Sequence, residues 1–316
     1  MQPQISFVVP LYNEEENFPL LVERLNKLMS ASSLAIEVIM VDDGSRDTTP
    51  QLMQANALMD ARYQCVFLSR NFGHQLALSS GLSVVRATEA VMCIDGDLQD
   101  PPELFNDFYT LFKEGNDVVY AVRKNRKENW FKKTAYYFYY RLLKSISNIE
   151  VNLDSGDFAL FSRKVVDILN QLPEESRYLR GLRSWVGFKQ IGFEYDRPER
   201  AMGETKYSFA MLYRLAYNGI FNFSDFPVKF ITNMGIITVL IALSYFVYTL
   251  VKRFVFGVPV IEGFTGLLFT IILFSGVQLV SLGIIGEYVL RIFFQVKGRP
   301  LFIIKSRIVD KEFSKE

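Results

Sequence analysis

Short apolar runs alternate with helix-like segments over the first part of the chain. The apolar runs are rich in β-branched residues and cover residues 5–9, 36–41, 65–68, 90–94 and 117–121. Helices are expected after Glu14, after Asp47, from Gly73 and after Pro102. Strands that alternate with helices build a mostly parallel sheet with helices on both faces. The pattern therefore predicts an α/β domain.

Two longer apolar runs follow near the C-terminus, at residues 230–251 and 263–286. A helix needs about 20 apolar residues to cross a bilayer, and both runs meet that length. The alternative is a pair of long core helices in a soluble domain. The first run carries no charge and the linker at 252–262 is short, which favours a transmembrane hairpin over 229–290 with spans at about 230–251 and 263–288.

Basic residues predict the orientation of that hairpin. Only Lys252 and Arg253 lie in the connecting loop, whereas the flanks carry Arg214, Lys229, Arg291, Lys297, Arg299, Lys305 and Arg307. The positive-inside rule then puts both termini in the cytoplasm. Residues 1–4 lead directly into a strand-like run, without the pattern of a signal peptide. We expect a multi-pass protein of the inner (plasma) membrane with a cytoplasmic catalytic domain.

The overall charge excludes one class of partner. The chain has 35 basic and 34 acidic residues, a net charge of +1, whereas nucleic-acid-binding domains carry a basic surplus. The two cysteines, Cys65 and Cys93, fall inside strand-like runs. We expect both to be core residues, with neither a disulfide framework nor a zinc site.

Acidic side chains follow three of the predicted strands. They stand in the segments PLYNEE at 10–15, DDGSRD at 42–47 and DGDLQD at 95–100. Ligands of parallel α/β sheets bind beyond the carboxyl ends of the strands. Asp-Gly-Asp alone is more often turn chemistry, but beside the other acidic strand ends Asp95 and Asp97 predict a site for Mg²⁺ or Mn²⁺. No glycine-rich phosphate loop is present, so neither ATP hydrolysis nor hydride transfer is favoured.

Six segments carry a resemblance over nearly the whole chain. They are SFVVPLYNEEENF, VDDGSRDTT, LSRNFGHQLALSSGL, CIDGDLQDPPE, SGDFALFSR and RAMGETKYS, followed by two apolar runs ending in GIIGEYVLRIF and KGRP. The chain resembles the family 2 glycosyltransferases that load a polyprenyl phosphate with a sugar, of the bactoprenol glucosyltransferase (GtrB) type. Dolichyl-phosphate mannose synthases and aminoarabinose undecaprenyl transferases are relatives. The resemblance implies a Rossmann-like GT-A fold, a nucleoside-diphosphate sugar donor, Mg²⁺ or Mn²⁺, a lipid phosphate acceptor and a homotetramer.

Roles for the donor side follow from the same resemblance. It places the nucleoside against Pro10, Tyr12 and Glu14, with Asp43 near the base. Asp95 then contacts the donor and the metal, and Asp97 and Gln99 hold the metal on the diphosphate. A metal there neutralises the charge that develops on the departing diphosphate. The alternative for Pro10 and Tyr12 is a turn proline and a packed aromatic ring.

Asp157 matches the position usually assigned as the catalytic base. The second pKa of a phosphate monoester is about 6, so the acceptor is largely a dianion at neutral pH and needs little help to lose a proton. Our hypothesis is that Asp157 orients the acceptor or a basic partner, with only modest base catalysis. The single histidine, His74, is expected at a helix terminus or in packing, because this chemistry needs no imidazole.

The acceptor phosphate requires cations, and the resemblance and the charge pattern offer four: Arg123, Arg126, Arg200 and Lys206. Arg200 and Lys206 belong to an RxxGxTK segment in which Gly203 allows a tight loop that can close over the bound donor. For Arg126, a solvated surface charge is an equally strong alternative to phosphate binding. For Arg200 this alternative is weaker.

The domain boundaries follow from these assignments. We expect a cytosolic catalytic domain at 1–207, a juxtamembrane amphipathic helix at 208–228, the hairpin at 229–290 and a cytosolic tail at 291–316. The aromatic and basic segment 130–149 is expected to lie in the headgroup layer, the alternative being packing on the domain core. Glu287 and Arg291, one helical turn apart, are expected to pair.

The sequence thus predicts an inverting enzyme that moves a hexose, glucose from UDP-glucose first, onto undecaprenyl phosphate at the cytoplasmic face, for later modification of a surface polysaccharide. GDP-mannose, UDP-N-acetylhexosamines and UDP-4-amino-arabinose stay open as donors. A processive polysaccharide synthase is disfavoured, since two spans form no channel and the Gln-x-x-Arg-Trp motif is missing. A non-catalytic nucleotide-sugar receptor is a further alternative, disfavoured by the intact Asp95, Asp97 and Asp157.

Overall fold

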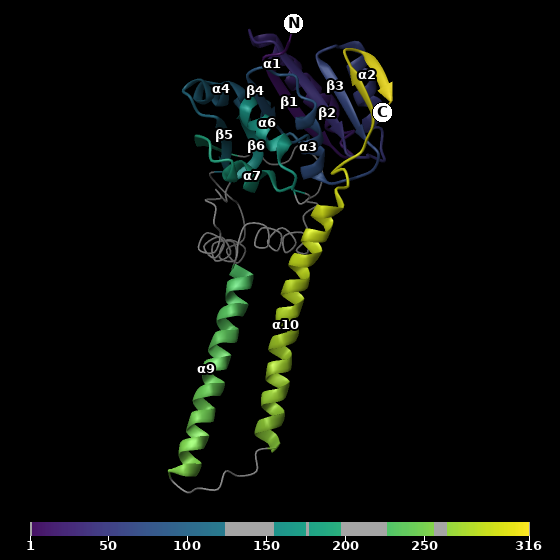
Figure 1. Ribbon diagram of the computed structural model, residues 1–316. Coiled ribbons are helices and arrows are strands. Elements are labelled where there is room, and N and C mark those ends of the chain that lie inside the picture. The colour runs from purple at the N-terminus through teal and green to yellow at the C-terminus, as the bar shows by residue number, and fades with distance from the viewer. Residues whose placement is uncertain (1, 124–154, 175–176, 197–225, 256–263, 316) are drawn as a thin grey trace. The chain divides into compact units, whose positions relative to one another are not determined.

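The computed structural model describes residues 2–123, 155–174, 177–196, 226–255 and 264–315 (Figure 1). The chain forms two compact units. The first, here the sheet unit, comprises Met1–Arg141, Ile149–Met211 and Arg299–Glu316. The second, here the helical unit, comprises Leu142–Asn148 and Leu212–Gly298.

The described part of the sheet unit contains one nine-stranded sheet in the order β7-β5-β6-β4-β1-β2-β3-β8-β9. The strands are β1 (Ile5–Leu11), β2 (Ile36–Asp42), β3 (Tyr63–Leu68), β4 (Ala90–Cys93), β5 (Val118–Arg123), β6 (Ser155–Ser162), β7 (Gln190–Tyr195), β8 (Ile304–Val309) and β9 (Glu312–Lys315). All five strands expected from the apolar runs are present, with small differences in their ends.

The sheet is mixed, whereas the alternation of strands and helices predicted a mostly parallel one. β1, β2, β3 and β4 are parallel neighbours, and so are β5 and β7. β6 enters antiparallel between β4 and β5, and β8 adds antiparallel to β3 with β9 beyond it. The expectation of a mostly parallel sheet was wrong because of β6, β8 and β9. The lengths and sequences of the segments before these strands do not indicate in which direction each strand runs.

Helices cover both faces of this sheet. They are α1 (Phe18–Ala31), α2 (Thr49–Met59), α3 (His74–Ser83), the 3₁₀ turn η1 (Pro102–Leu104), α4 (Phe105–Lys113), α6 (Arg163–Gln171) and α7 (Leu179–Trp185). Apolar residues of α1, α2 and α4 share one core with alternate residues of the strands, such as Ile5, Phe7 and Val9 of β1. α3, α6 and α7 contact one another and the remaining strand residues. Side chains alternate between the faces of a strand, so both faces are apolar and every residue of β1 is buried.

Both cysteines are buried in the strands of this core, and the described structure holds them as free thiols. Burial raises the pKa of the Cys65 and Cys93 thiols. This confirms their expected role as core residues.

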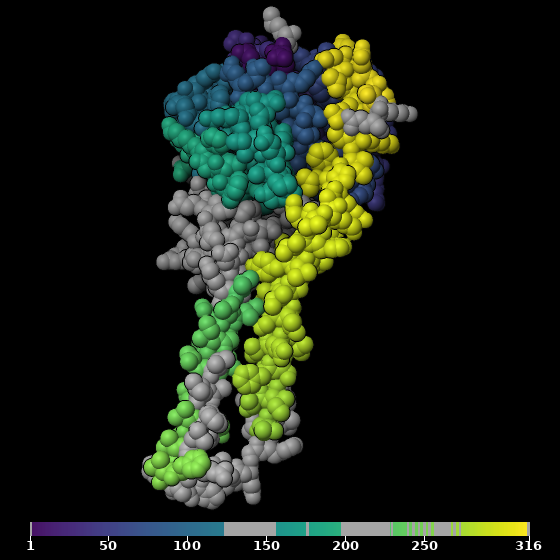
Figure 2. Space-filling view, viewed as in Figure 1, coloured from purple at the N-terminus to yellow at the C-terminus, as the bar shows by residue number. Residues whose placement is uncertain are grey.

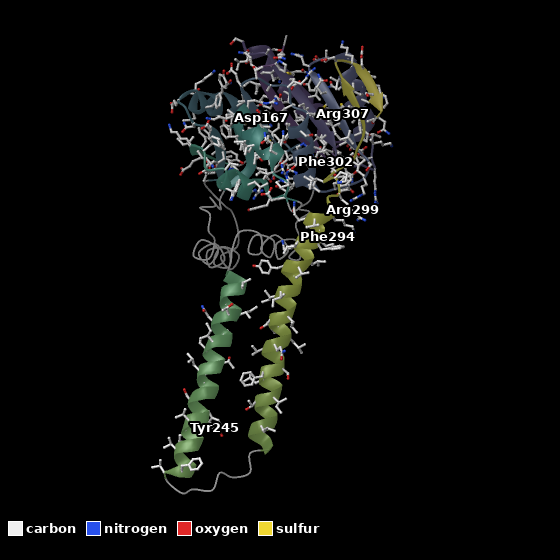
Figure 3. All side chains as sticks on the ribbon, viewed as in Figure 1. Asp167, Tyr245, Phe294, Arg299, Phe302 and Arg307 are labelled. Carbon is white, nitrogen blue, oxygen red and sulfur yellow. The ribbon has the colours of Figure 1, made fainter. Side chains whose placement is uncertain are left out.

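The C-terminal residues complete the sheet, whereas the sequence predicted only a tail at 291–316. Cys65 pairs with Ile308, and Leu68 pairs with Ile304. Figure 2 shows these residues, in yellow, on the surface of the sheet unit, and Figure 3 labels Arg307 on β8. β8 therefore pairs with a strand that lies some 240 residues earlier in the sequence, and β9 pairs with β8.

The helical unit contains two long helices, α9 (Phe226–Phe254) and α10 (Phe264–Lys297). They contain the predicted spans at 230–251 and 263–288 almost entirely. Among the described residues, one segment, Leu273–Lys297, is long and apolar enough to cross a membrane. The Nε of Arg291 donates to Glu287 at 2.9 Å, as expected for that pair. Membrane crossing by α9 stays a prediction.

Candidate active site

The loops that follow β1 and β2 are bonded to each other. The N–H of Asn13 donates to the Ser45 hydroxyl at 3.0 Å, and the Asn13 side-chain oxygen accepts the Arg46 N–H at 2.8 Å. The Glu14 N–H donates to the Thr49 hydroxyl at 2.9 Å. Asn13 has a left-handed backbone, φ 53°, which asparagine tolerates better than most residues. The segment that carries Pro10, Tyr12 and Glu14 is thus fixed beside the second strand end.

Asp43, at the end of β2, holds the loop that leads into α3. Its two carboxylate oxygens accept the backbone N–H groups of Phe72 at 2.7 Å and Gly73 at 2.9 Å. The residue is 3% exposed, and burial raises the pKa of Asp43 in spite of these hydrogen bonds. Asp43 therefore sets the position at which α3 begins.

Asp95, Gly96 and Asp97 follow β4, which pairs directly with β1. A Cβ atom on Gly96 would lie 3.1 Å from the Pro10 carbonyl oxygen, so this loop packs closely on the end of β1. Asp97 Oδ1 accepts the Gln99 N–H at 3.2 Å. The acidic loop and the predicted nucleoside-binding segment are therefore neighbours.

The same loop is tied to the far part of the sheet by a buried pair. The Tyr195 hydroxyl, at the end of β7, donates to Asp100 Oδ1. Asp100 is 1% exposed and Tyr195 is 6% exposed. Leu98, between the bonded positions, is buried with φ 60°, a conformation that persists only where the surroundings fix it. The loop after β4 is thus held at both ends.

His74, the first residue of α3, lies between two carboxylates. Its Nε2 is 3.4 Å from Asp95 Oδ1 and 3.5 Å from Asp157 Oδ2. Burial disfavours the imidazolium, but the two carboxylates outweigh it and raise the pKa of His74 to about 9. The expected helix-terminus position is correct, and the ring also joins the acidic groups of two different strands.

Asp157, on β6, is bonded through both oxygens. Arg180 Nε donates to Oδ1 at 2.9 Å, and Arg180 Nη2 donates to Oδ2 at 2.9 Å. Gln75 Nε2 donates to Oδ2 at 2.9 Å. The Asp157 side chain is 6% exposed. Three elements, α3, β6 and α7, therefore meet at one carboxylate.

The two carboxylates beside His74 differ in their electrostatics. Burial raises the pKa of Asp157, but Arg180 and then His74 overcome it and hold that pKa well below its ordinary value. Burial also raises the pKa of Asp95, to about 6, with Asp100, Asp157 and Asp97 adding to the rise and His74 opposing it. The loop after β4 is thus a place where negative charge is crowded and a cation is stabilised.

Comparison with known proteins identifies the family. A model of glycosyl transferase family 2 matches residues 6–169. The YkcC protein of Bacillus subtilis, an uncharacterized glycosyltransferase, is 41% identical over 305 residues, covering 96% of this chain and 93% of its own. The chain belongs to glycosyl transferase family 2. This confirms the family expected from the six sequence segments.

Another relative of this family 2 glycosyltransferase is the SfII prophage-derived bactoprenol glucosyl transferase of Shigella flexneri. It is 37% identical over 304 residues, covering 96% of this chain and 97% of its own. Residues 1–349 of Staphylococcus aureus TarS, a solved structure, align with 70% of this chain and 66% of that one at 17% identity and a TM-score of 0.43. The family assignment rests on the sequence relatives, and the α/β unit with its mixed sheet is GT-A-like, as expected.

The structure of the glycosyltransferase brings most of the predicted donor-side residues to one edge of the sheet. Six of them follow strand ends in the sheet unit: Tyr12, Glu14, Asp43, Asp95, Asp97 and Gln99. Pro10 is the last but one residue of β1, and Asp157 is the third residue of β6. Arg123 ends β5, in register with Tyr195 of β7. Arg126, Arg200, Lys206 and the segments 130–149 and 208–225 lie outside the described residues, so the expectations for them stay predictions, as does the tetramer.

Two residues that donate hydrogen bonds to Asp157, Arg180 and Gln75, were not predicted from the sequence. Gln75 stands in the segment LSRNFGHQLALSSGL, which predicted a role only for its neighbour His74. Arg180 begins a short helix 23 positions after Asp157, without a motif around it. Only the pairing of β6 beside α7 brings the two together, so no local signal marks Arg180.

The acidic loop after β4 can supply part of the ligand set of a divalent cation, with substrate phosphates supplying the rest. Among the described residues, no group of three or more His, Cys, Asp or Glu side chains is placed to hold a metal by itself. Mg²⁺ is usually bound by one or two carboxylates together with substrate phosphates rather than by a complete protein cage. Asp95 and Asp97, whose surroundings are rich in negative charge, can supply such a pair of oxygen ligands.

Proposed function

We propose that this glycosyltransferase transfers a hexose, glucose from UDP-glucose first, to a polyprenyl phosphate at the cytoplasmic face of the membrane. The observation that carries the proposal is the similarity over 96% of the chain to proteins named bactoprenol glucosyl transferases. The arrangement of acidic, imidazole and guanidinium groups at one edge of the sheet supports it. The product would be a lipid-linked sugar donor for surface polysaccharide modification.

Chain connectivity supports two membrane crossings. Residues before α9 and residues after α10 belong to one sheet, because β8 pairs with β3. A chain that leaves a domain and returns to it crosses the bilayer an even number of times. If Leu273–Lys297 spans the membrane, another segment between residues 196 and 273 has to span it as well, and among the described residues of that interval α9 is the long apolar helix.

The proposed reaction is a single displacement. An oxygen of the acceptor phosphate attacks the anomeric carbon, the bond from that carbon to the diphosphate breaks, and the electron pair leaves with the nucleoside diphosphate. The configuration inverts, so an α-linked donor gives a β-linked product. Pro10, Tyr12, Glu14 and Asp43 would hold the nucleoside. Arg123, Arg126, Arg200 and Lys206 would hold the acceptor phosphate.

Asp95, Asp97 and Gln99 would bind Mg²⁺ or Mn²⁺ on the diphosphate. A divalent cation there supplies Lewis-acid stabilisation of the departing diphosphate, worth several kcal/mol. Asp95 also lies beside His74, which fixes the orientation of its carboxylate relative to the donor. The other positions of the loop, tied down through Asp100 and Tyr195, keep Asp97 in place.

The test is transfer of labelled sugar from a panel of UDP- and GDP-sugars to undecaprenyl phosphate by purified protein, with Mg²⁺, Mn²⁺ or EDTA. A single metal-dependent lipid product that carries one sugar supports the proposal and identifies the donor. Products of increasing length would indicate a processive synthase instead. Donor binding with no transfer to any acceptor would favour a nucleotide-sugar receptor.

A variant pair tests the metal ligands. Asp97→Asn should reduce turnover by about 10²-fold or more, since several kcal/mol of transition-state stabilisation is lost. Asp107→Asn, which changes an exposed carboxylate on α4, should leave turnover unchanged. Binding of Mn²⁺ in the presence of UDP, followed by electron paramagnetic resonance, should weaken in the first variant and not in the second. Equal Mn²⁺ binding by both variants would remove Asp97 from the site.

A further inference from the structure

The Asp157 carboxylate is enclosed by donors. Its two oxygens accept three hydrogen bonds of 2.9 Å, two from Arg180 and one from Gln75. His74 Nε2 lies 3.5 Å from Oδ2, and the side chain is 6% exposed. A general base needs an accessible lone pair directed at the proton that it removes. Most of the accepting capacity of Asp157 is already used by protein donors.

The donors themselves are held rigidly. Gln75 Oε1 accepts the Leu179 N–H at 2.9 Å, so the Gln75 amide bridges the first turn of α3, Asp157 and the start of α7. One turn after Arg180, the Arg183 guanidinium lies 4.3 Å from the centre of the Tyr120 ring and is 1% exposed. The Arg183 carbonyl accepts the Gln190 side-chain N–H at 2.7 Å. The short helix α7 is therefore fixed to β5 and β7 as well as to Asp157.

We propose that Asp157 is a positioning residue: together with Gln75 it fixes the Arg180 guanidinium and the first turn of α3 in the orientation in which they meet the acceptor phosphate. This inference rests on the proposed function, because it assigns the acceptor phosphate as the anion that the arrangement serves. Arg180 and Gln75 then join the set of residues that the reaction depends on, although neither was apparent from the sequence.

The chemistry of the transfer agrees with this role. A phosphate monoester with a second pKa of about 6 is largely a dianion at neutral pH, so its attacking oxygen carries no proton to remove. The new bond from phosphate oxygen to anomeric carbon forms as the bond to the diphosphate breaks, and no proton is transferred. A carboxylate facing the acceptor without a cation would repel it, whereas a carboxylate neutralised by a guanidinium does not.

The charges around Asp157 act in the same direction. Arg180 and His74 together lower the pKa of Asp157 well below its ordinary value, so the carboxylate stays ionised and bonded. The titratable groups that influence it come from α3, α7 and β4 with its following loop: His74, Arg180, Arg183, Cys93 and Asp95. An anion with such neighbours is a poor proton acceptor and a strong anchor for cations.

The test compares Asp157→Asn, Arg180→Gln and the double variant in the full-length protein, with steady-state kinetics against acceptor concentration. Each single change should lower kcat/KM for the acceptor by about 10²-fold, the loss that misplacement of a reacting group typically causes. The double variant should have a kcat/KM no lower than that of the less active single variant, because the two residues act as a unit. Asp167→Asn, which breaks a partly exposed ion pair on α6 (labelled in Figure 3), is the control and should leave kcat/KM unchanged.

The dependence of kcat/KM on pH separates positioning from base catalysis. In the positioning role the acidic limb belongs to the acceptor, so it stays in place in Asp157→Asn and moves when the phosphate is replaced by a phosphonate with a higher second pKa. In the base role the limb belongs to Asp157: Asp157→Asn removes it, Arg180→Gln moves it to higher pH, and the phosphonate does not shift it. The second pattern would overturn the inference.

Two further readouts keep the outcome decisive. Wild-type protein that transfers sugar to no phosphate acceptor would refute the proposed function, and the melting temperatures of the variants would still report on the positioning arrangement. Strictly additive losses of melting temperature in Asp157→Asn, Arg180→Gln and the double variant would show that the two residues are not coupled and would overturn the inference. If the charge variants do not fold, Gln75→Leu removes a neutral side chain that donates to Asp157 and accepts the Leu179 N–H. It should raise the acceptor KM without moving the pH limb, and an unchanged KM would contradict the proposal.

Discussion

Replacing Gly44 by alanine should damage the site through the backbone alone. Gly44 follows Asp43 and has φ +71°, a left-handed conformation that costs an L-residue about 1–2 kcal/mol. A Cβ atom there would lie 2.6 Å from the Arg70 carbonyl carbon and 2.6 Å from the Asn71 nitrogen. Both are backbone atoms and cannot turn aside, so the loop that leads into α3 has to move.

The size of the effect follows from what that movement breaks. The next residues of the loop, Phe72 and Gly73, donate the two N–H bonds to the buried Asp43 carboxylate. Hydrogen bonds to charged groups contribute about 1.5–3 kcal/mol each. Adding the backbone strain gives a loss of at least about 4 kcal/mol. Gly115 is the matched control, since its φ is +87° with nothing within 4 Å of the added Cβ, and its change to alanine should cost only the strain, about 1–2 kcal/mol.

Thermal unfolding and activity measure the two consequences separately. At roughly 2–4 °C per kcal/mol for a domain of this size, Gly44→Ala should melt at least about 8 °C below wild type and Gly115→Ala only about 2–8 °C below. His74 follows Gly73 directly, so Gly44→Ala should also lose about 10²-fold in turnover per ångström of displacement, and Gly115→Ala should lose none. Equal melting temperatures with full activity in both variants would refute this account of the loop.

Three further substitutions test individual contacts in the sheet unit. Arg86→Ala removes the guanidinium partner of Glu37, whose side chain is 3% exposed, and should cost about 3 kcal/mol. Asp310→Ala removes only the exposed partner of the same arginine, 61% exposed, and should cost about 1 kcal/mol or less, because exposed ion pairs contribute little. Thermal unfolding measures both, and equal losses would contradict the distinction. Tyr195→Phe leaves the buried Asp100 without its hydroxyl donor and should cost about 1–3 kcal/mol. Because Asp100 lies in the loop of Asp97, that variant should also need more Mn²⁺ for half-maximal activity, and an unchanged Mn²⁺ requirement would disconnect the pair from the metal loop.

The part of the fold that the sequence predicted well is the part made of uninterrupted buried strands. β1 and β2 are buried at every residue, and strands buried on both faces appear in the sequence as continuous apolar runs. The polar segments directly after them then mark the strand ends, and the structure places these segments next to one another. The start of α3 was also recognisable, since a glycine, Gly73, stands directly before His74, the first residue of the helix.

The part that the sequence did not reveal depends on contacts between distant segments. Asp157 meets Arg180 only because β6 runs antiparallel beside β4 and brings α7 to the same edge. Within β8 the polar Ser306 is buried and the apolar Val309 is exposed, so the sequence of this strand shows no clear alternation of apolar and polar residues. Its partner β3 also lies far away in the sequence. Local patterns specify whether a segment can be a strand, but they do not specify which strand it joins.

The pairing of β8 with β3 has a consequence for how the protein reaches its active form. The Ser69 N–H, directly after β3, donates to the Ile303 carbonyl at 2.9 Å, and the Asp310 N–H donates to Gln64 Oε1 at 2.9 Å. These bonds form only after α9 and α10 have been synthesised, since residues 303–310 follow both helices. Ser69 is also the first residue of the loop that leads to His74. The backbone N–H groups of Phe72 and Gly73 in this loop donate to the Asp43 carboxylate. The edge of the sheet that supports this loop is therefore completed last, after the apolar helices have been made.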